Sequence, residues 1–261
     1  MHNTRPPAVA GMFYPLSAST LKQDIHAYLD QASPPETIPK ALVVPHAGYI
    51  FSGPVAASAY KHLIPIKHNI QRVVLLGPSH RVAFRGLAVP ESEFFSTPLG
   101  DIPIDHDAIN KLANLTQVIV SDQAHKDEHS LEVQLPFLQE VLDDFSLIPL
   151  VVGDASTEEV AEVIEKLWGD EHTLIVISTD LSHYHEYNEA RQLDRSTSEA
   201  IEKLQPEQIG YDDACGRNGL NGMLAVAAHK NLHAETIDLR NSGDTAGDKS
   251  RVVGYGAYVF H

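Results

Sequence analysis

The sequence predicts an α/β fold in which one sheet is covered by helices. Short apolar, β-branched runs alternate with segments whose apolar residues recur at helical spacing, and this alternation is typical of such folds. The chain has 261 residues, of which 43% are hydrophobic, so it can bury a large core. The two segments richest in turn formers, residues 31–39 and 241–249, are too short to separate domains. We therefore expect a single domain spanning residues 1–261.

Eight runs predict strands. Six of them are short and apolar throughout, as buried strands are, and they span residues 41–44, 72–76, 87–89, 118–120, 147–152 and 174–177. Two closing strands are expected at residues 234–239 and 252–260. In the last of these, Gly254 and Gly256 are interleaved with tyrosines, which indicates close backbone contact on one face of the strand.

Six segments between or after these strands predict helices. They span residues 54–63, 106–113, 130–142, 157–168, 188–204 and 218–228. The clearest start signal belongs to the helix at residue 157, because Ser156 and Thr157 precede acidic residues in its first turn.

Composition argues against several classes of function. The formal charge of −16 would repel a phosphate backbone, and no run of Lys or Arg offsets it, so we expect no nucleic-acid partner. No stretch approaches the roughly 20 apolar residues of a membrane span, and the N-terminal residues contain no apolar run typical of a secretory signal. We therefore expect no membrane association and a cytoplasmic location. The single cysteine excludes an intramolecular disulfide.

Histidines collect where predicted strands end. His46 follows the first strand in Val-Val-Pro-His-Ala-Gly-Tyr, His80 follows the second in Gly-Pro-Ser-His, and Asp180 and His183 follow the sixth in Ser-Thr-Asp-Leu-Ser-His. In an open α/β sheet, ligands bind beyond the carboxyl ends of the strands. Three strand ends that are followed by histidine predict one shared cleft. The alternative is that a chain with 15 histidines places some of them at strand ends by chance.

Cys215 lies in a polar turn just before the helix expected at Asn218. Near a helix N-terminus, partial positive charge and free N–H groups favour the thiolate, which is the form that binds metal. The alternative is a small buried apolar cysteine, and the polar residues 216–219 argue against it. Because imidazole and thiolate bind transition metals well, His46, His80 and Cys215 make a metal centre the first hypothesis.

Three further residues are candidate catalytic groups. His129 opens a predicted helix and could either reach the cleft or cap that helix. Asp180 and His183 are three residues apart in a turn, so the carboxylate could orient an imidazole or hold a metal-bound water. The chain lacks the Gly-x-Ser-x-Gly elbow of serine hydrolases, and the glycines between residues 210 and 222 lack the spacing and the lysine of a phosphate-binding loop.

Five motifs, in order along the chain, resemble those of the Memo family, whose bacterial and archaeal members are called AmmeMemoRadiSam system protein B. The motifs are Pro-His-Ala-Gly-Tyr at 45–49, Gly-Pro-Ser-His at 77–80, Asp-Glu-His-Ser at 127–130, Ser-Thr-Asp-Leu-Ser-His at 178–183 and Cys-Gly-Arg at 215–217. The resemblance extends from about residue 5 to residue 260. It implies an α/β/α sandwich around a central mixed, largely parallel sheet, like that of class III extradiol dioxygenases, the non-haem iron enzymes that open catechol rings.

The resemblance also implies a metal site and redox activity. His46, His80 and Cys215 match the ligand positions of the family, with His129, Asp180 and His183 around them. The family is credited with binding iron or copper, and its eukaryotic members are also described as adaptors in receptor-driven cell motility. Members are often encoded beside a radical-SAM protein, which makes such a protein a candidate partner.

Two departures limit what carries over from the related enzymes. Ring-cleaving dioxygenases hold Fe(II) with two histidines and a glutamate, whereas a thiolate at Cys215 shifts metal preference toward copper or zinc and is itself open to oxidation. Catechol cleavage is therefore not implied, and if it occurred, His183 would be the general base because imidazole titrates near neutral pH. Residues 218–220, Asn-Gly-Leu, replace the His-Pro-type continuation of eukaryotic members, which puts a shared peptide-binding role in doubt.

Three functions remain open at this point. The first is a metal-dependent redox enzyme, dioxygenase-like in its site, that acts on a small molecule. The second is a non-catalytic binding or scaffold protein whose cleft recognises a peptide or a protein. The third is a zinc hydrolase in which Asp180 or His183 is the base for a metal-activated water.

Overall fold

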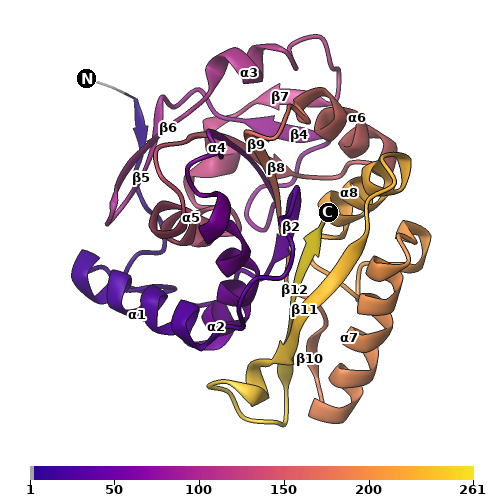
Figure 1. Ribbon diagram of the computed structural model, residues 1–261. Helices are drawn as coiled ribbons and strands as arrows, with labels where there is room; N and C mark the ends of the chain where they lie inside the picture. Colours follow the sequence, from indigo (N-terminus) through magenta and orange to yellow (C-terminus); the bar gives the residue numbers. More distant parts are fainter. Residues whose placement is uncertain (1–2) are drawn as a thin grey trace.

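A nine-stranded mixed sheet runs through the centre of the computed structural model, which describes residues 3–261 (Figure 1). The strand order is β10-β12-β2-β9-β3-β8-β4-β7, and β11, which is outside this order, also pairs with β12. The strands are β2 Ala41–Val44, β3 Arg72–Pro78, β4 Leu87–Val89, β7 Val118–Val120, β8 Ser146–Val152, β9 Thr173–Ser178, β10 His183–His185, β11 Ala234–Asn241 and β12 Val252–Phe260.

The central strands β2, β9, β3 and β8 are parallel, and antiparallel pairs join β12 to β2 and β4 to β8. These four strands are buried along almost their whole length, which is why they read as continuous apolar runs. Their carboxyl ends meet at one edge, since Val44 is in register with Ser178 and Pro78 with Val152.

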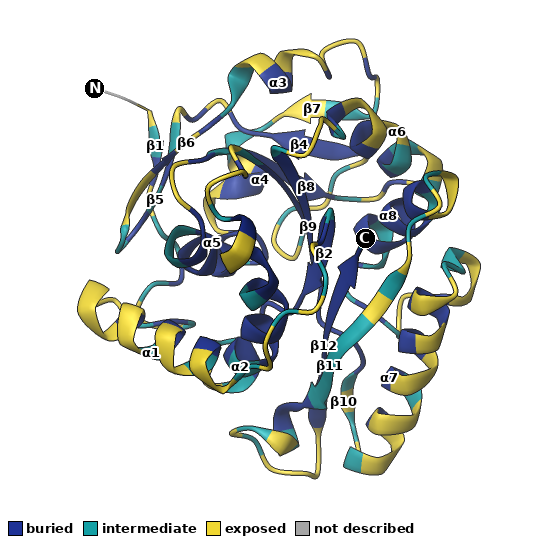
Figure 2. Ribbon diagram, in the orientation of Figure 1, coloured by how far each residue is buried: buried dark blue, intermediate teal, exposed yellow. Residues whose placement is uncertain are grey.

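Helices cover both faces of the sheet (Figure 1). Helices α1, α2 and α5 pack on one face, and α6, α7 and α8 on the other. The helices are α1 Ala18–Gln31, α2 Tyr49–Tyr60, α3 His106–Asn110, α4 Asp122–Lys126, α5 Leu135–Val141, α6 Thr157–Leu167, α7 Tyr187–Glu202 and α8 Arg217–His229, with short 3₁₀ helices at Lys61–Ile66, Glu132–Gln134, Pro206–Gln208 and Ser242–Asp244. The expected α/β/α sandwich with a mixed sheet is confirmed, and Figure 2 shows its buried strands between helices whose outer faces are exposed.

Several element boundaries differ from the sequence expectation. Helix α2 begins at Tyr49, one turn before the expected start at Pro54, and it holds that proline in its interior. A proline inside a helix removes one backbone hydrogen bond. Nine of the twelve residues of α2 are buried, so packing outweighs this loss. The helix at Thr157 begins as expected, because Ser156 and Glu159 form a reciprocal capping box.

Several elements were not predicted from the sequence, among them α4, β10 and the two features that follow. Helix α1 buries Leu21, Ile25 and Leu29, which recur at helical spacing. A separate three-stranded sheet has the order β1-β5-β6, with β1 Thr4–Arg5, β5 Phe94–Thr97 and β6 Gly100–Pro103. Its first strand has two residues and pairs with a segment about 90 residues away, so no local pattern marks it. None of the helices within residues 3–261 is long and apolar enough to cross a membrane.

Gly254 on β12 lies against Asp194 of α7, which confirms the close backbone contact expected on this strand. A Cβ at Gly254 would lie 2.1 Å from the Asp194 carboxylate. Asp194 Oδ1 accepts a hydrogen bond from the Ser182 N–H at 3.0 Å, and the residue is 2% exposed. Burial raises the pKa of Asp194 to about 6.

This buried carboxyl is expected to make stability depend on pH. Because its pKa is higher in the folded than in the unfolded chain, its neutral form stabilises the fold at low pH, and this contribution is lost as pH rises through about 6. Asp194→Asn keeps an acceptor for Ser182 and removes the charge. Relative to wild type, the variant should therefore gain up to about 3 kcal/mol of unfolding free energy between about pH 4 and pH 7. Urea unfolding of wild type and variant at both pH values measures this gain. The same difference in unfolding free energy between the two proteins at about pH 4 and at about pH 7 would contradict it.

Candidate metal centre

Three metal-ligand side chains from different parts of the chain meet at the carboxyl edge of the sheet. His46 follows β2, His80 follows β3 and Cys215 precedes α8. One ligand atom from each lies within 4.8 Å of the others, and His46 Nε2 is 3.4 Å from Cys215 Sγ. The structure thus brings together the three residues that the sequence predicts as ligands.

His46 is held so that its Nε2 lone pair faces Cys215. Ser178 Oγ donates its proton to the Ser130 carbonyl at 2.6 Å, so it must accept at 2.9 Å from the N–H on His46 Nδ1. The ring is 2% exposed, and burial, together with the neighbouring His80 and His129, lowers the pKa of His46 well below its usual value. His46 is therefore neutral, with its free nitrogen in the cluster, which is the form that binds a metal.

The carboxylate of Glu128, which was not predicted as a site residue, holds His80 in place. The His80 Nδ1 donates to Glu128 Oε1 at 2.9 Å and its backbone N–H to Glu128 Oε2 at 2.5 Å. Oε1 also accepts the backbone N–H groups of His129 and Ser130, both at 2.9 Å. Carboxylates in this position fix the tautomer and orientation of metal-binding histidines. The sequence signals for Glu128 were its adjacency to the candidate His129 and its place in the Asp-Glu-His-Ser motif.

Glu128 is ionised although it is buried. Burial alone would raise the pKa of this carboxyl, but the hydrogen bonds from His80 and from backbone N–H groups lower it to about 2. The carboxylate thus presents a full negative charge to the Nδ1 side of His80. It leaves the other ring nitrogen of His80 free for the cluster.

Cys215 corrects one expectation from the sequence. Its Sγ accepts a hydrogen bond from the Asp180 N–H at 3.3 Å, and α8 begins two residues later. Burial and the Asp180 carboxylate raise the pKa of the Cys215 thiol to about 12. In the free protein the thiol is therefore protonated, contrary to the thiolate expected from the helix N-terminus. A bound cation would displace this proton, since a coordinating thiol is deprotonated outright.

The other candidate residues line the same cleft, which has a volume of about 660 Å³. The His129 ring stacks on His80 with 4.7 Å between centroids, and Asp180 Oδ2 is 4.0 Å from His46 Nε2. Asp180 Oδ1 also accepts the His46 backbone N–H at 2.8 Å, and His183 lies half-buried on the cleft wall. Five of the six residues singled out from the sequence thus line one cavity, and the sixth, Cys215, contacts His46 beside it, while their roles stay predictions.

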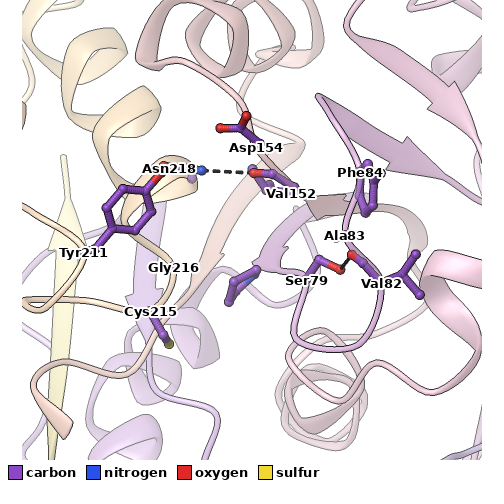
Figure 3. A pocket seen from close by; sticks show the side chains of 13 residues that line it. Ser79, Val82, Ala83, Phe84, Val152, Asp154, Tyr211, Cys215, Gly216 and Asn218 are labelled. Atoms are coloured by element: carbon purple, nitrogen blue, oxygen red, sulfur yellow. Dashed lines mark hydrogen bonds between the residues drawn. The ribbon is translucent and has the colours of Figure 1, made fainter.

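Cys215 also borders a second cavity, of about 430 Å³, between the ends of β3 and β8 and the start of α8 (Figure 3). Tyr211 and Asn218 stand on one side, with Phe84 opposite them. Two of its polar side chains bond protein carbonyls, since Asn218 donates to the Gly153 carbonyl at 2.9 Å and Ser79 to that of Val82 at 2.5 Å. Of the three ligand candidates, only Cys215 lines this cavity.

Comparison with known proteins finds similarity over almost the whole chain. The family model described as Memo-like protein matches residues 5–259. A "MEMO1 family protein" of Aquifex aeolicus is 36% identical over 275 residues, covering 98% of both chains, and one of Ignicoccus hospitalis is 37% identical over 284 residues with the same coverage. A crystal structure of an uncharacterised Escherichia coli K12 protein shares the fold, with a TM-score of 0.55 and 15% identity over 84% of this chain and 99% of that one.

Proposed function

The chain belongs to the Memo-like protein family, and on that premise we propose that it binds one iron or copper ion through His46, His80 and Cys215 and acts in redox chemistry on a small molecule. The observation that carries this proposal is the arrangement of the two histidines. The Nδ1 of His46 bonds Ser178 and the Nδ1 of His80 bonds Glu128. Both Nε2 atoms are therefore left for a metal. Nitrogen and sulfur donors suit transition metals, whereas Mg²⁺ and Ca²⁺ prefer oxygen.

Three protein ligands leave coordination positions for a substrate. When bound, iron or copper supplies one-electron redox chemistry and Lewis acidity at this point. The remaining residues serve binding and proton transfer. His183 can take a proton from a substrate hydroxyl group, and Asp180 holds the His46 loop through its backbone N–H.

Metal analysis of protein purified without oxygen tests the proposal. We expect about one iron or copper ion per chain, and a new charge-transfer absorption band when a catechol-type ligand is added, because such a band requires an open coordination position. A folded protein that stays metal-free after reconstitution with either metal would overturn the proposal. Turnover of esters that needs zinc and no oxygen would favour a zinc hydrolase instead.

Glu128→Gln is expected to weaken metal binding about 10- to 100-fold, as loss of a carboxylate behind a ligating histidine typically does. Glutamine keeps the size of the side chain but replaces one acceptor oxygen with an NH₂ group, so a donor from the His80 loop loses its partner. Competition with a chromophoric chelator measures the change. Glu140→Gln is the matched control, because Glu140 also bonds a histidine, His26, but outside the centre. Equal affinities of wild type and Glu128→Gln would contradict the assigned role.

A second candidate function, recognition of a peptide or protein partner, is favoured by an exposed apolar surface. Met12, Leu16 and Ile50 are all more than 60% exposed, and the Phe13 carbonyl accepts the Tyr49 N–H at 2.8 Å, which joins their two segments beside the cleft. A radical-SAM protein is the first partner to test. Binding that survives His46→Ala combined with His80→Ala would place such a partner outside the cleft.

A further inference from the structure

Tyr184 has an unusual backbone conformation at the mouth of the metal cleft. It lies in β10 between His183 and His185, which pair with adjacent residues of β12, so Tyr184 is the extra residue of a β-bulge. Its φ is +64°, a left-handed value that bulky side chains seldom adopt, and its ring is largely exposed. Bulges re-aim side chains beside active sites, and left-handed non-glycine residues cluster at ligand clamps. The bulge thus holds an aromatic ring on the cleft wall.

Two arginines that bond no carboxylate of residues 3–261 share this cleft with Tyr184. The Arg251 guanidinium lies over the Tyr184 ring, with Cζ 5.2 Å from the ring centroid, and Arg81 lines the same cavity. Neither guanidinium has a hydrogen-bond acceptor or a carboxylate partner within residues 3–261. In a chain with a formal charge of −16, two guanidinium groups without a carboxylate partner at one cleft favour an anionic ligand.

Two carboxylates also line the cleft, those of Asp180 and Asp248, but within residues 3–261 neither forms an ion pair with these arginines. The Asp248 carboxylate accepts the Ser250 N–H at 2.8 Å and also its hydroxyl, and Asp180 lies deep beside His46. Phe13 and Phe51 supply aromatic surface to the walls. The cleft therefore offers flat apolar surface together with two guanidinium groups at its mouth, and its volume suits a small molecule.

We propose that the cleft binds a small organic anion with a flat apolar body. Its carboxylate-type group meets the Arg251 guanidinium, which is suited to planar oxyanions, and Arg81 adds positive charge to the same cleft, while its body packs against Tyr184 and Phe13. The opposite end of the ligand then faces the histidines of the metal centre. Only the assignment of that end as the one that reacts rests on the proposed metal function. Tyr184 and Arg251 act as specificity-determining residues.

Benzoate and benzamide, which match in size and differ in charge, are the probes. Calorimetric titration of the metal-loaded protein should give benzoate an affinity at least about tenfold higher than that of benzamide. Arg251→Gln should remove most of this preference, and Arg81→Gln part of it. Arg195→Gln, an exposed arginine of α7 outside the cleft, should leave it unchanged. The proposal would be overturned if both probes bound equally well or if neither bound. It would also be overturned if the preference for benzoate survived both Arg251→Gln and Arg81→Gln.

Tyr184→Asn separates a binding role from a structural one. Asparagine accepts the left-handed conformation more readily than tyrosine, so the thermal midpoint should be equal to or above that of wild type. Benzoate affinity should nevertheless fall several-fold, whereas Tyr184→Phe should retain both properties. A variant with a lowered midpoint and unchanged benzoate affinity would show that Tyr184 serves only the fold.

Metal content measured on the same samples keeps this proposal separate from the metal function. A benzoate preference in protein that takes up no metal would refute the metal site and leave the anion site standing. Full metal binding without any benzoate preference would refute the anion site alone.

Discussion

Cys215→Ser is expected to remove tight binding of iron or copper while leaving the fold intact. The thiolate is the soft, anionic member of the proposed ligand set, and a serine hydroxyl is a poor substitute because it stays protonated. The loss of metal affinity should exceed the 10- to 100-fold effect of removing a residue that hydrogen-bonds a ligand. Serine is smaller than cysteine and can still accept the Asp180 N–H, so no buried donor loses its acceptor.

The measurement is metal stoichiometry after reconstitution without oxygen, combined with chelator competition. Copper-loaded wild type should also show a thiolate-to-copper absorption band that the variant lacks. His229→Ala is the control, because it removes an exposed histidine from α8, the helix that Cys215 precedes. Unchanged stoichiometry and affinity in Cys215→Ser would exclude the thiol as a ligand and leave the two histidines without their third partner.

The arrangement of His46, His80 and Asp180 could be predicted because it follows from the sheet. Parallel strands end at one edge, so residues that directly follow strand-like runs meet there whatever their separation in sequence. Cys215 could be placed near a helix N-terminus, since α8 begins two residues after it.

The supporting residues could not be predicted, because their roles depend on packing between distant segments. Glu128 meets His80 from 48 residues away, and no spacing rule links them. The protonated state of Cys215 arises from its burial and from the Asp180 carboxylate, which outweigh the nearby helix end. The left-handed Tyr184 depends on pairing between β10 and β12, which local sequence does not specify.

A buried ion pair between Arg5 and Glu132 holds the N-terminal segment that contains Phe13, a residue that lines the cleft. Glu132 Oε2 accepts hydrogen bonds from Arg5 Nη1 at 2.8 Å and from the Ala8 N–H at 2.7 Å, and Oε1 accepts the Val9 N–H and the Tyr14 hydroxyl. Both charged side chains are less than 5% exposed. A single carboxylate thus satisfies four donors.

Glu132→Ala is therefore expected to destabilise the fold by about 3–5 kcal/mol, the cost typical of leaving one partner of a buried pair uncompensated. The Arg5 guanidinium would keep its bonds to the carbonyls of His125 and Glu128 but would lose its counter-charge. Urea unfolding measures the change, and breaking the exposed pair of Lys203 and Glu199 by Lys203→Ala should cost less than about 1 kcal/mol.

Combining Glu132→Leu with Arg5→Met separates the unpaired charge from the lost hydrogen bonds. If the buried cation dominates the cost, the double variant should be more stable than Glu132→Leu alone, because no charge is then left without a partner. It should remain less stable than wild type, since the N–H groups of Ala8 and Val9 still lack their acceptor. A double variant as unstable as the sum of its single variants would instead assign the cost to the hydrogen bonds that hold the N-terminal segment.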